Sequence, residues 1–357
     1  EYVARGTYVY PAEPSLRLVA ETFQYCAEQV PNWNPISISG YHMREAGATA
    51  VQELAFTFAN ALAYVETARA AGLAVDAFAP RLSFFFACHS DLFEEVAKFR
   101  AARRIWARLM RTRYDASDAS CRLRFHTQTG GVTLTAQQPL NNMVRVAIQA
   151  LAATLGGTQS LHTNGYDEAL ALPTADAATL ALRTQQIVAH ESGIAATADP
   201  LAGSYFVESL TDEVERRVMV LLAEVEARGG SVKAIDAGFF QDEIGRSAYD
   251  HQMAVEHGAR VVVGVNKYDD GQPVPIIPAP DYRALEAGQV ARVRAAREKR
   301  DARRVAAALE ALKAAAPGAG AADSRVMPCI LDAVRARATV GEISDTFEAV
   351  YGRYRAS

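Results

Sequence analysis

Residues 35–47 read PISISGYHMREAG and combine a strand-like pattern with several polar side chains. From Ile36 to Ser39, isoleucine and serine alternate with the period of two that is typical of a β-strand. A histidine, an arginine and a glutamate follow at once, just before a long helix with apolar periodicity. In barrels of parallel strands, the functional site lies at the carboxyl ends of the strands. The stretch therefore predicts a site immediately after its strand.

Around this stretch, strands and helices alternate four times between about residues 15 and 165, which is typical of parallel βαβ units. Four such strands are half of a closed eight-stranded barrel. The predicted fold class is therefore α/β, with the C-terminal half of a (β/α)8 TIM barrel followed by a mostly helical region. The predicted strands are 36–40, 82–87, 123–127 and 158–162, and the predicted helices begin at Ser15, near Val51, at Ser90 or Asp91, and at Asn141 or Asn142.

Past Pro173 the pattern becomes mostly helical, with Thr174 and Thr211 as candidate N-caps and an isolated strand at 261–265. Residues 282–315 predict one long charged helix, and 316–320 predict a flexible connector because they contain proline and glycine.

Three domains are predicted from these changes. Residues 1–175 are predicted to form the second half of the barrel, 176–281 a barrel-completing helical region, and 282–357 a C-terminal helical segment. The chain begins with glutamate and passes directly into structured-looking sequence, so we expect it to be part of something longer.

Composition excludes several classes of protein. Half of the 357 residues are hydrophobic, and 37 basic against 41 acidic residues give a net charge of -4, which argues against nucleic-acid or membrane binding. No apolar run reaches the ~18 residues that cross a bilayer. The four cysteines have no C-x-x-C spacing, so we expect reduced thiols and a cytoplasmic location.

Four histidines, His42, His89, His126 and His162, fall at or just beyond predicted strand ends. Histidines that converge at a barrel mouth could bind a divalent metal. Alternatively, each forms a hydrogen bond in a polar cleft. No aspartate is evident at the matching strand ends, which disfavours the metal site, and we assign no metal ligand.

We expect two arginines, Arg5 and Arg81, to lie at strand edges in apolar surroundings, where a guanidinium needs an anion. That anion could be a protein carboxylate or a ligand. Glu45 and Glu168 could be helix-cap acids, although residues 161–169 are denser in polar groups than an ordinary strand-to-helix turn.

Six motifs occur in order along the chain: ISISGYHMREAG (36–47), APRLSFF (79–85), FHTQTGG (125–131), GTQSLHTN (157–164), ADP (198–200) and GVNKY (264–268). In sequence and spacing they resemble the methylmalonyl-CoA mutase family, the adenosylcobalamin-dependent acyl-CoA mutases. The resemblance runs from Arg5 to about Arg353.

The resemblance implies a (β/α)8 barrel that threads acyl-CoA along its axis and a separate flavodoxin-like domain that presents cobalamin to the barrel mouth. This chain is similar only to the second half of that barrel and the helical region after it. The cobalamin domain's Asp-x-His-x-x-G motif is absent. The chain therefore resembles the large subunit of a split mutase, with a separate small cobalamin-binding subunit and a hetero-oligomeric assembly.

Residue roles follow from the same resemblance. His42 would bond the thioester carbonyl of the substrate as a partial acid, and Arg5 would bind its free carboxylate. Arg81, Leu82 and Ser83 would hold CoA. The residues implied to face adenosylcobalamin are Ala4, Arg5, Glu45, Gln128, Gly131, Asn164, Glu168, Ala169 and Ala171, of which Gln128 and Asn164 would lie toward the adenosyl group.

One position departs from the family pattern. Where the family has a lysine in Pro-Lys-Phe-Asn, this chain has Asn32 in Pro31-Asn32-Trp33-Asn34. A charged CoA contact is lost there, so we expect a weaker grip on CoA or a substitute lysine elsewhere.

The predicted reaction is the interconversion of methylmalonyl-CoA and succinyl-CoA. Relatives that act on isobutyryl-CoA or 2-hydroxyisobutyryl-CoA resemble the chain at 84–89 but carry glutamine where Arg5 stands. Their substrates lack the second carboxylate, and a buried unpaired arginine would cost several kcal/mol. Arg5 thus favours a dicarboxylic acyl group, and ethylmalonyl-CoA stays an alternative because it keeps the carboxylate.

Two other classes of protein remain as alternatives. A metal-dependent barrel hydrolase would hold an ion at His42, His126 and His162. A non-catalytic half-barrel that scaffolds a partner would tolerate replacement of His42 or Arg5. We also expect that this segment does not fold alone, because half a barrel leaves two unpaired strand edges and an open core.

Overall fold

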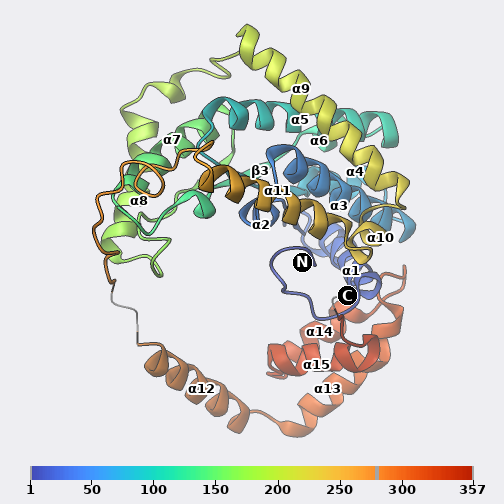
Figure 1. The fold of residues 1–357 in the computed structure, drawn as a ribbon. Coiled ribbons are helices and arrows are strands. Elements are labelled where there is room, and N and C mark those ends of the chain that lie inside the picture. Colours follow the sequence, from blue (N-terminus) through green and yellow to red (C-terminus); the bar gives the residue numbers. More distant parts are fainter. Residues whose placement is uncertain (1, 278–280, 356–357) are drawn as a thin grey trace. The chain divides into compact units, whose positions relative to one another are not determined.

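The computed structural model describes residues 2–277 and 281–355 (Figure 1). The chain divides into two compact units. The first contains residues 1–6, 36–62 and 82–277, and the second contains 7–35, 63–81 and 278–357. The three predicted domain ranges stay a prediction beside this division.

The first unit is built on a parallel sheet of four strands in the order β1-β2-β3-β4. Parallel strands need crossover connections, and helices provide them here. The observed strands agree in number and order with the predicted ones, and their ends differ by at most two residues. The strands are β1 (Ser37–Ser39), β2 (Ser83–Cys88), β3 (Phe125–Thr129) and β4 (Ser160–His162).

Helices pack against this sheet and against one another, and α9 lies alongside α5 (Figure 1). The helix α5 begins as predicted, because the Asp91 side chain accepts a hydrogen bond from the Glu94 N–H. The helices of the first unit are α2 (Tyr41–Glu45), α5 (Leu92–Tyr114), α6 (Asp118–Cys121), α7 (Asn141–Leu155), α8 (Ala175–His190), α9 (Tyr205–Ala227), α10 (Ser231–Asp236) and α11 (Phe239–Glu256), with 3-10 turns Gly131–Thr133 and Ile194–Ala196.

Aromatic side chains fill the core between the sheet and α5. Trp106 of α5 packs edge-on against Phe84 of β2, with ring centroids 4.9 Å apart. Phe99 stacks on Phe125 of β3 at 5.2 Å. All four side chains are buried, so they fix α5 against the sheet.

The second unit has its own core, made by Leu312, Ala316, Ala319, Val326 and Phe347. Its helices are α1 (Ala12–Gln29), α4 (Val75–Phe78), α12 (Tyr282–Glu298), α13 (Ala302–Ala315), α14 (Val326–Arg335) and α15 (Val340–Tyr351), with 3-10 turns Ala79–Arg81 and Ala316–Gly318, and α3 (Ala50–Ala70) contributes residues to both units.

Several local predictions were wrong. The helix predicted from Ser15 begins at Ala12. Thr211 lies inside α9 and donates its hydroxyl to the Val207 carbonyl instead of capping a helix. Residues 261–265 form no strand and make a single bridge between Val263 and Lys267.

The two predictions for the C-terminal region were also wrong. The helix predicted over 282–315 is two helices, because the Asp301 side chain caps a new helix start by accepting from the N–H groups of Arg303 and Arg304. The predicted flexible connector at 316–320 is ordered, since Ala316 and Ala319 are buried in the core of the second unit.

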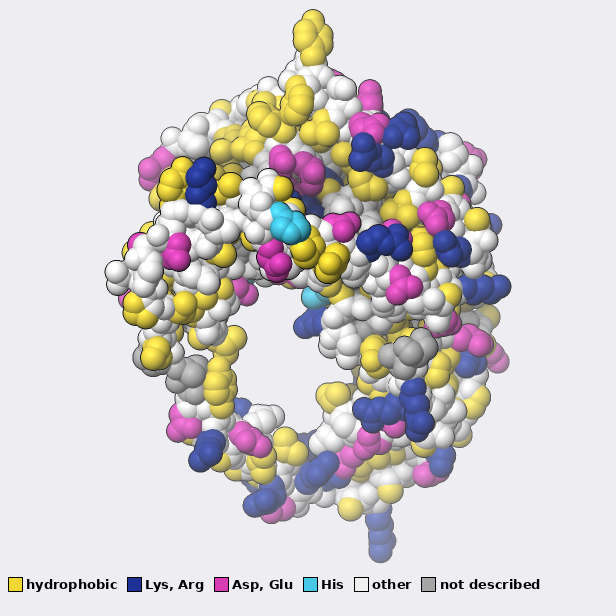
Figure 2. All heavy atoms as spheres, viewed as in Figure 1, with side chains coloured by type: hydrophobic (Ala, Val, Ile, Leu, Met, Phe, Trp, Pro, Cys, Tyr) yellow, Lys and Arg dark blue, Asp and Glu magenta, His cyan; other side chains and the backbone are white. Residues whose placement is uncertain are grey.

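Charged side chains of both signs are interspersed over the face drawn in Figure 2. None of the described helices is both long and apolar enough to cross a membrane. The four cysteines are free thiols, as predicted.

Candidate functional site

Polar side chains gather where the four parallel strands end. Because the strands are parallel, their carboxyl ends lie at one edge of the sheet. Glu45 lies at the end of α2, directly after β1. His89 follows β2, Gly131 follows β3, and Asn164 follows β4. The structure thus brings together groups from all four strand ends.

Glu45 is fixed by the loop after β3. The backbone N–H of Val132 donates to Glu45 Oε2 at 2.8 Å. Burial, together with the negative charges of Glu168 and Glu53, raises the pKa of the Glu45 carboxyl to about 7 against the opposing effect of the Val132 and Gly131 N–H groups. A carboxyl that titrates near neutral pH in a cleft can act as a donor or an acceptor of hydrogen bonds.

Asn164 links the ends of β3 and β4. Its backbone N–H donates to Thr129 Oγ1 at 2.9 Å, and its side-chain amide donates to the Thr129 carbonyl at 3.0 Å. Its side-chain oxygen accepts from Gln128 Nε2 at 2.9 Å. A Cβ at Gly131 would lie 2.9 Å from Glu45 Oε2 and 3.2 Å from Asn164 Nδ2, so glycine lets the loop approach both side chains.

His42 lies half-buried on α2. Its Nδ1 lies 3.0 Å from Ser39 Oγ, and its ring meets Phe85 edge-on with centroids 5.9 Å apart. The neighbouring Tyr41 is buried and stacks on Phe85 at 4.7 Å. Burial, followed by the charge of Glu45, raises the pKa of the Tyr41 hydroxyl, which keeps it protonated. Sequence analysis did not single out Tyr41.

The histidines do not form a metal site within the described residues, 2–277 and 281–355, where no group of three or more His, Cys, Asp or Glu side chains is placed to hold an ion. His126 Nδ1 instead lies 2.7 Å from Ser160 Oγ. His42 and His126 thus each lie within hydrogen-bond distance of a serine hydroxyl.

The remaining residues implied to face a cofactor lie in irregular segments. Ala4 and Arg5 are exposed in a bend near the N-terminus. The expectation that Arg5 lies at an apolar strand edge was therefore wrong. Glu168, Ala169 and Ala171 lie in the turns after β4, where burial raises the pKa of Glu168. The structure does not test their roles.

The residues implied to hold CoA lie beside β2. Arg81 ends the 3-10 turn before the strand, and its Nη2 donates to Asn32 Oδ1 at 2.7 Å. Asn32, the departure from the family pattern, is thus a neutral partner for this guanidinium. Leu82 is buried, and Ser83 Oγ donates to the Ile36 carbonyl at 2.9 Å.

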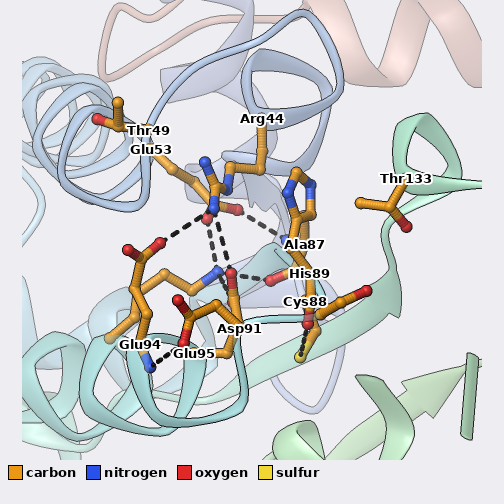
Figure 3. Close-up of polar contacts among 12 residues, drawn as sticks. Arg44, Thr49, Glu53, Ala87, Cys88, His89, Asp91, Glu94, Glu95 and Thr133 are labelled. Carbon is orange, nitrogen blue, oxygen red and sulfur yellow. Dashed lines mark hydrogen bonds and ion pairs between the residues drawn. The ribbon is translucent and has the colours of Figure 1, made fainter. Parts of the chain in front are cut away.

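A buried network of charges beneath the strand ends was not predicted (Figure 3). Lys98 of α5 lies 2.8 Å from Glu53 Oε2 and 2.5 Å from Glu95 Oε2, and all three side chains are fully buried. Arg44 adds contacts of 3.3 Å to Glu94 and Glu95. The sequence contained a signal for this network, because Glu53 interrupts the apolar face of α3 and Glu95 and Lys98 interrupt that of α5.

The network also holds the end of β2. Glu53 Oε1 accepts from the Ala87 N–H at 2.7 Å, and Lys98 Nζ donates to the Ala87 carbonyl at 2.7 Å. The positive charges of Lys98 and Arg44 hold the pKa of Glu95 at about 2 against the opposing effect of burial. Both polar groups of Ala87, two residues before His89, are therefore fixed.

Comparison with known proteins agrees with this geometry. The profile of the methylmalonyl-CoA mutase family matches residues 1–353. The chain belongs to this family. Related mutases include methylmalonyl-CoA mutase of Rhizobium meliloti, 49% identical over the whole chain and 50% of its own length, and that of Escherichia coli, 46% identical over 99% of the chain and 49% of its own length.

A third family member is the 2-hydroxyisobutanoyl-CoA mutase large subunit of Aquincola tertiaricarbonis, 47% identical over 99% of this chain and 63% of its own length. The chain thus spans about half to two thirds of the length of these curated relatives. The family match confirms the resemblance seen in the motifs, and the half-barrel with its helical region agrees with the predicted fold class.

Proposed function

We propose that this chain is the catalytic large-subunit barrel of an adenosylcobalamin-dependent mutase that interconverts methylmalonyl-CoA and succinyl-CoA, an intramolecular transfer. The family match over residues 1–353 carries the proposal. The gathering of Glu45, His89, Gly131 and Asn164 at the strand ends supports it, because barrel enzymes carry their sites there. A separate small subunit that binds cobalamin and a cytoplasmic location belong to the same proposal.

The residues at the strand ends fit a ligand rich in amides, such as cobalamin. Glu45 Oε1 and His89 Nε2 are enclosed atoms that make no hydrogen bond within the described residues. Gly131 has no side chain, which leaves the space beside Glu45 open. Glu45, Gly131, Asn164 and Glu168 would hold the cofactor by hydrogen bonds and close backbone approach. Adenosylcobalamin, when bound, supplies a carbon radical by homolysis of its cobalt–carbon bond.

The protein's own part is to bind, orient and exclude water. His42 would donate a hydrogen bond from its ring to the thioester carbonyl of the substrate, in the direction fixed by Ser39 and Phe85. Arg81 would offer a charged contact to CoA, with Asn32 holding part of its guanidinium.

The choice of acyl group depends on Arg5. A guanidinium pairs with a free carboxylate by two parallel hydrogen bonds, and methylmalonyl-CoA offers that carboxylate. Since Arg5 is exposed in this structure, the energetic argument from a buried, unpaired arginine no longer supports this choice. The choice of a dicarboxylic acyl group is supported by the presence of an arginine at position 5, where relatives that act on substrates without a second carboxylate carry glutamine.

Substrate assays with the full-length protein test this proposal. The protein is mixed with its cobalamin-binding partner and adenosylcobalamin, and turnover of methylmalonyl-CoA, isobutyryl-CoA and 2-hydroxyisobutyryl-CoA is compared. We expect succinyl-CoA to form and kcat/KM for methylmalonyl-CoA to fall by about 100-fold or more in Arg5→Gln, because a charge-assisted pair to the substrate carboxylate is lost.

A surface arginine serves as the control. Arg217→Gln on α9 removes an exposed guanidinium that pairs with Glu213, and it should leave kcat/KM unchanged. Turnover of isobutyryl-CoA or 2-hydroxyisobutyryl-CoA in place of methylmalonyl-CoA would contradict the assignment of the acyl group.

A further inference from the structure

Glu45 and His89 face each other across the ends of two neighbouring strands. Glu45 Oε1 lies 3.9 Å from His89 Nε2, and the two side chains are 23% and 16% exposed. The two facing atoms are themselves enclosed, and neither makes a hydrogen bond to any residue that the structure describes. A movement of about 1 Å would bring them to hydrogen-bond distance.

Two adjacent glycines hold the loop after β3 against both side chains. A Cβ at Gly130 would lie 2.5 Å from His89 Cδ2 and 2.9 Å from His89 Nε2. A Cβ at Gly131 would lie 2.9 Å from Glu45 Oε2. No side chain fits at either position without displacing Glu45 or His89. The loop therefore keeps the two side chains next to each other.

The charges around the pair place the proton on Glu45 when no ligand is bound. On the His89 side, burial lowers the pKa of the imidazole well below its usual value, and Arg44, Lys98 and Arg260 add to this effect while Glu95 opposes it. Histidine at this place is therefore a neutral acceptor near neutral pH.

On the Glu45 side, burial is the main cause that raises the carboxyl pKa to about 7. Glu168 and Glu53 act in the same direction, and Tyr41 stays neutral. Within the described residues, the groups that face the pair from α2, α3, α5 and the loops are thus Tyr41, Arg44, Glu53, Glu95, Lys98, Glu168 and Arg260.

The charge network keeps His89 in place. It fixes both polar groups of Ala87, two residues before His89, and Figure 3 shows the ring of His89 beside Arg44. The network therefore fixes the backbone two residues before the imidazole.

From this geometry we propose that Glu45 and His89 share a single proton, so that His89 determines whether Glu45 donates or accepts a hydrogen bond toward a ligand at the strand ends. The O–H bond at Glu45 Oε1 breaks as the N–H bond at His89 Nε2 forms, and no other group gains or loses a proton. The pair stays neutral in both forms, which avoids an unpaired buried charge.

The pair suits a ligand that carries amide groups. With the proton on His89, Glu45 accepts from an amide N–H, and with the proton on Glu45 it donates to an amide carbonyl. This inference rests on the proposed function for the nature of that ligand, the cobalamin face. His89 acts through Glu45 and is a positioning residue.

Infrared titration of the full-length protein, without cobalamin or acyl-CoA, tests the shared proton. The C=O band of protonated Glu45 is identified as the band that Glu45→Gln removes, and its intensity is followed against pH in wild type and His89→Gln. We expect the midpoint to fall by about one pH unit or more in His89→Gln, because the imidazole that would accept from the Glu45 O–H is lost and the glutamine N–H favours the carboxylate. His190→Gln, at the exposed end of α8, should leave the midpoint unchanged.

A second measurement needs no change at His89. In wild-type protein with ¹⁵N-labelled histidine, the Nε2 resonance of His89 should shift over the same pH range as the Glu45 band, and Glu45→Gln should abolish that shift. An unchanged infrared midpoint in a folded His89→Gln variant, or a His89 resonance that does not respond in this range, would overturn the proposal.

These titrations are independent of catalysis. If methylmalonyl-CoA is not turned over but the two titrations are coupled, the proposed function fails and the shared proton stands. If turnover occurs and the titrations are uncoupled, only the shared proton fails.

Discussion

At the scale of a single residue, the raised pKa of Glu45 makes stability depend on pH. The folded chain holds the Glu45 proton more tightly than the unfolded chain, since the pKa rises from its ordinary 4.5 to about 7. The stability that this carboxyl contributes is complete below the unfolded pKa and is lost as the pH rises through about 7. Relative to Glu45→Gln, we expect wild type to lose at most about 3 kcal/mol between pH 4 and pH 8.

Chemical denaturation of both proteins at a series of pH values measures this difference. Glutamine retains the oxygen that accepts from Val132, so the comparison isolates the charge. A constant difference in unfolding free energy across this range would mean that Glu45 titrates in the folded protein as it does in the unfolded one.

At the scale of elements, the buried lysine of α5 joins that helix to α3 and β2. Lys98→Met removes the cation between Glu53 and Glu95 and leaves two buried carboxylates without it. We expect a loss of about 3–5 kcal/mol in unfolding free energy, because breaking a buried pair leaves an uncompensated charge. Urea denaturation of the full-length variant measures the loss, and adding Glu53→Gln should recover part of it.

An exposed pair provides the control at this scale. Arg69 and Glu66 lie one turn apart on α3 with side chains 48% and 56% exposed. Arg69→Met should cost about 0.5 kcal/mol or less, since water screens such pairs. Equal losses for the two variants would show that the buried network contributes no more than a surface pair.

At the scale of the whole molecule, the sheet has two edges. β1 and β4 stand at the ends of the strand order, and each has one neighbour in the described chain. A parallel sheet with open edges and an uncovered core is unfavourable in water. We expect the isolated 357-residue segment to lack a single cooperative thermal transition that the full-length protein shows. Calorimetry on the isolated segment and on the full-length protein tests this expectation. A sharp thermal transition in the isolated segment would contradict it.

Patterns that are local in sequence determined much of this protein by themselves. The alternation at 36–39 and the caps Asp91 and Thr174 predicted a strand and two helix starts, because hydrophobic period and capping act over a few neighbouring residues. Ordered motifs determined the family. The charged composition of 282–315 predicted one helix and missed the break at Asp301, whose side chain caps a second helix.

Only the tertiary structure decided which polar groups meet. His89 was one of four histidines at strand ends, and Glu45 one of two acids that could have been helix caps. Their pairing depends on the parallel register of β1 and β2 and on the two glycines after β3. The burial of Lys98 and the exposure of Arg5 were likewise decided by packing between distant segments. Charge, burial and hydrogen bonding at such sites depend on neighbours far apart in the chain, which no local pattern encodes.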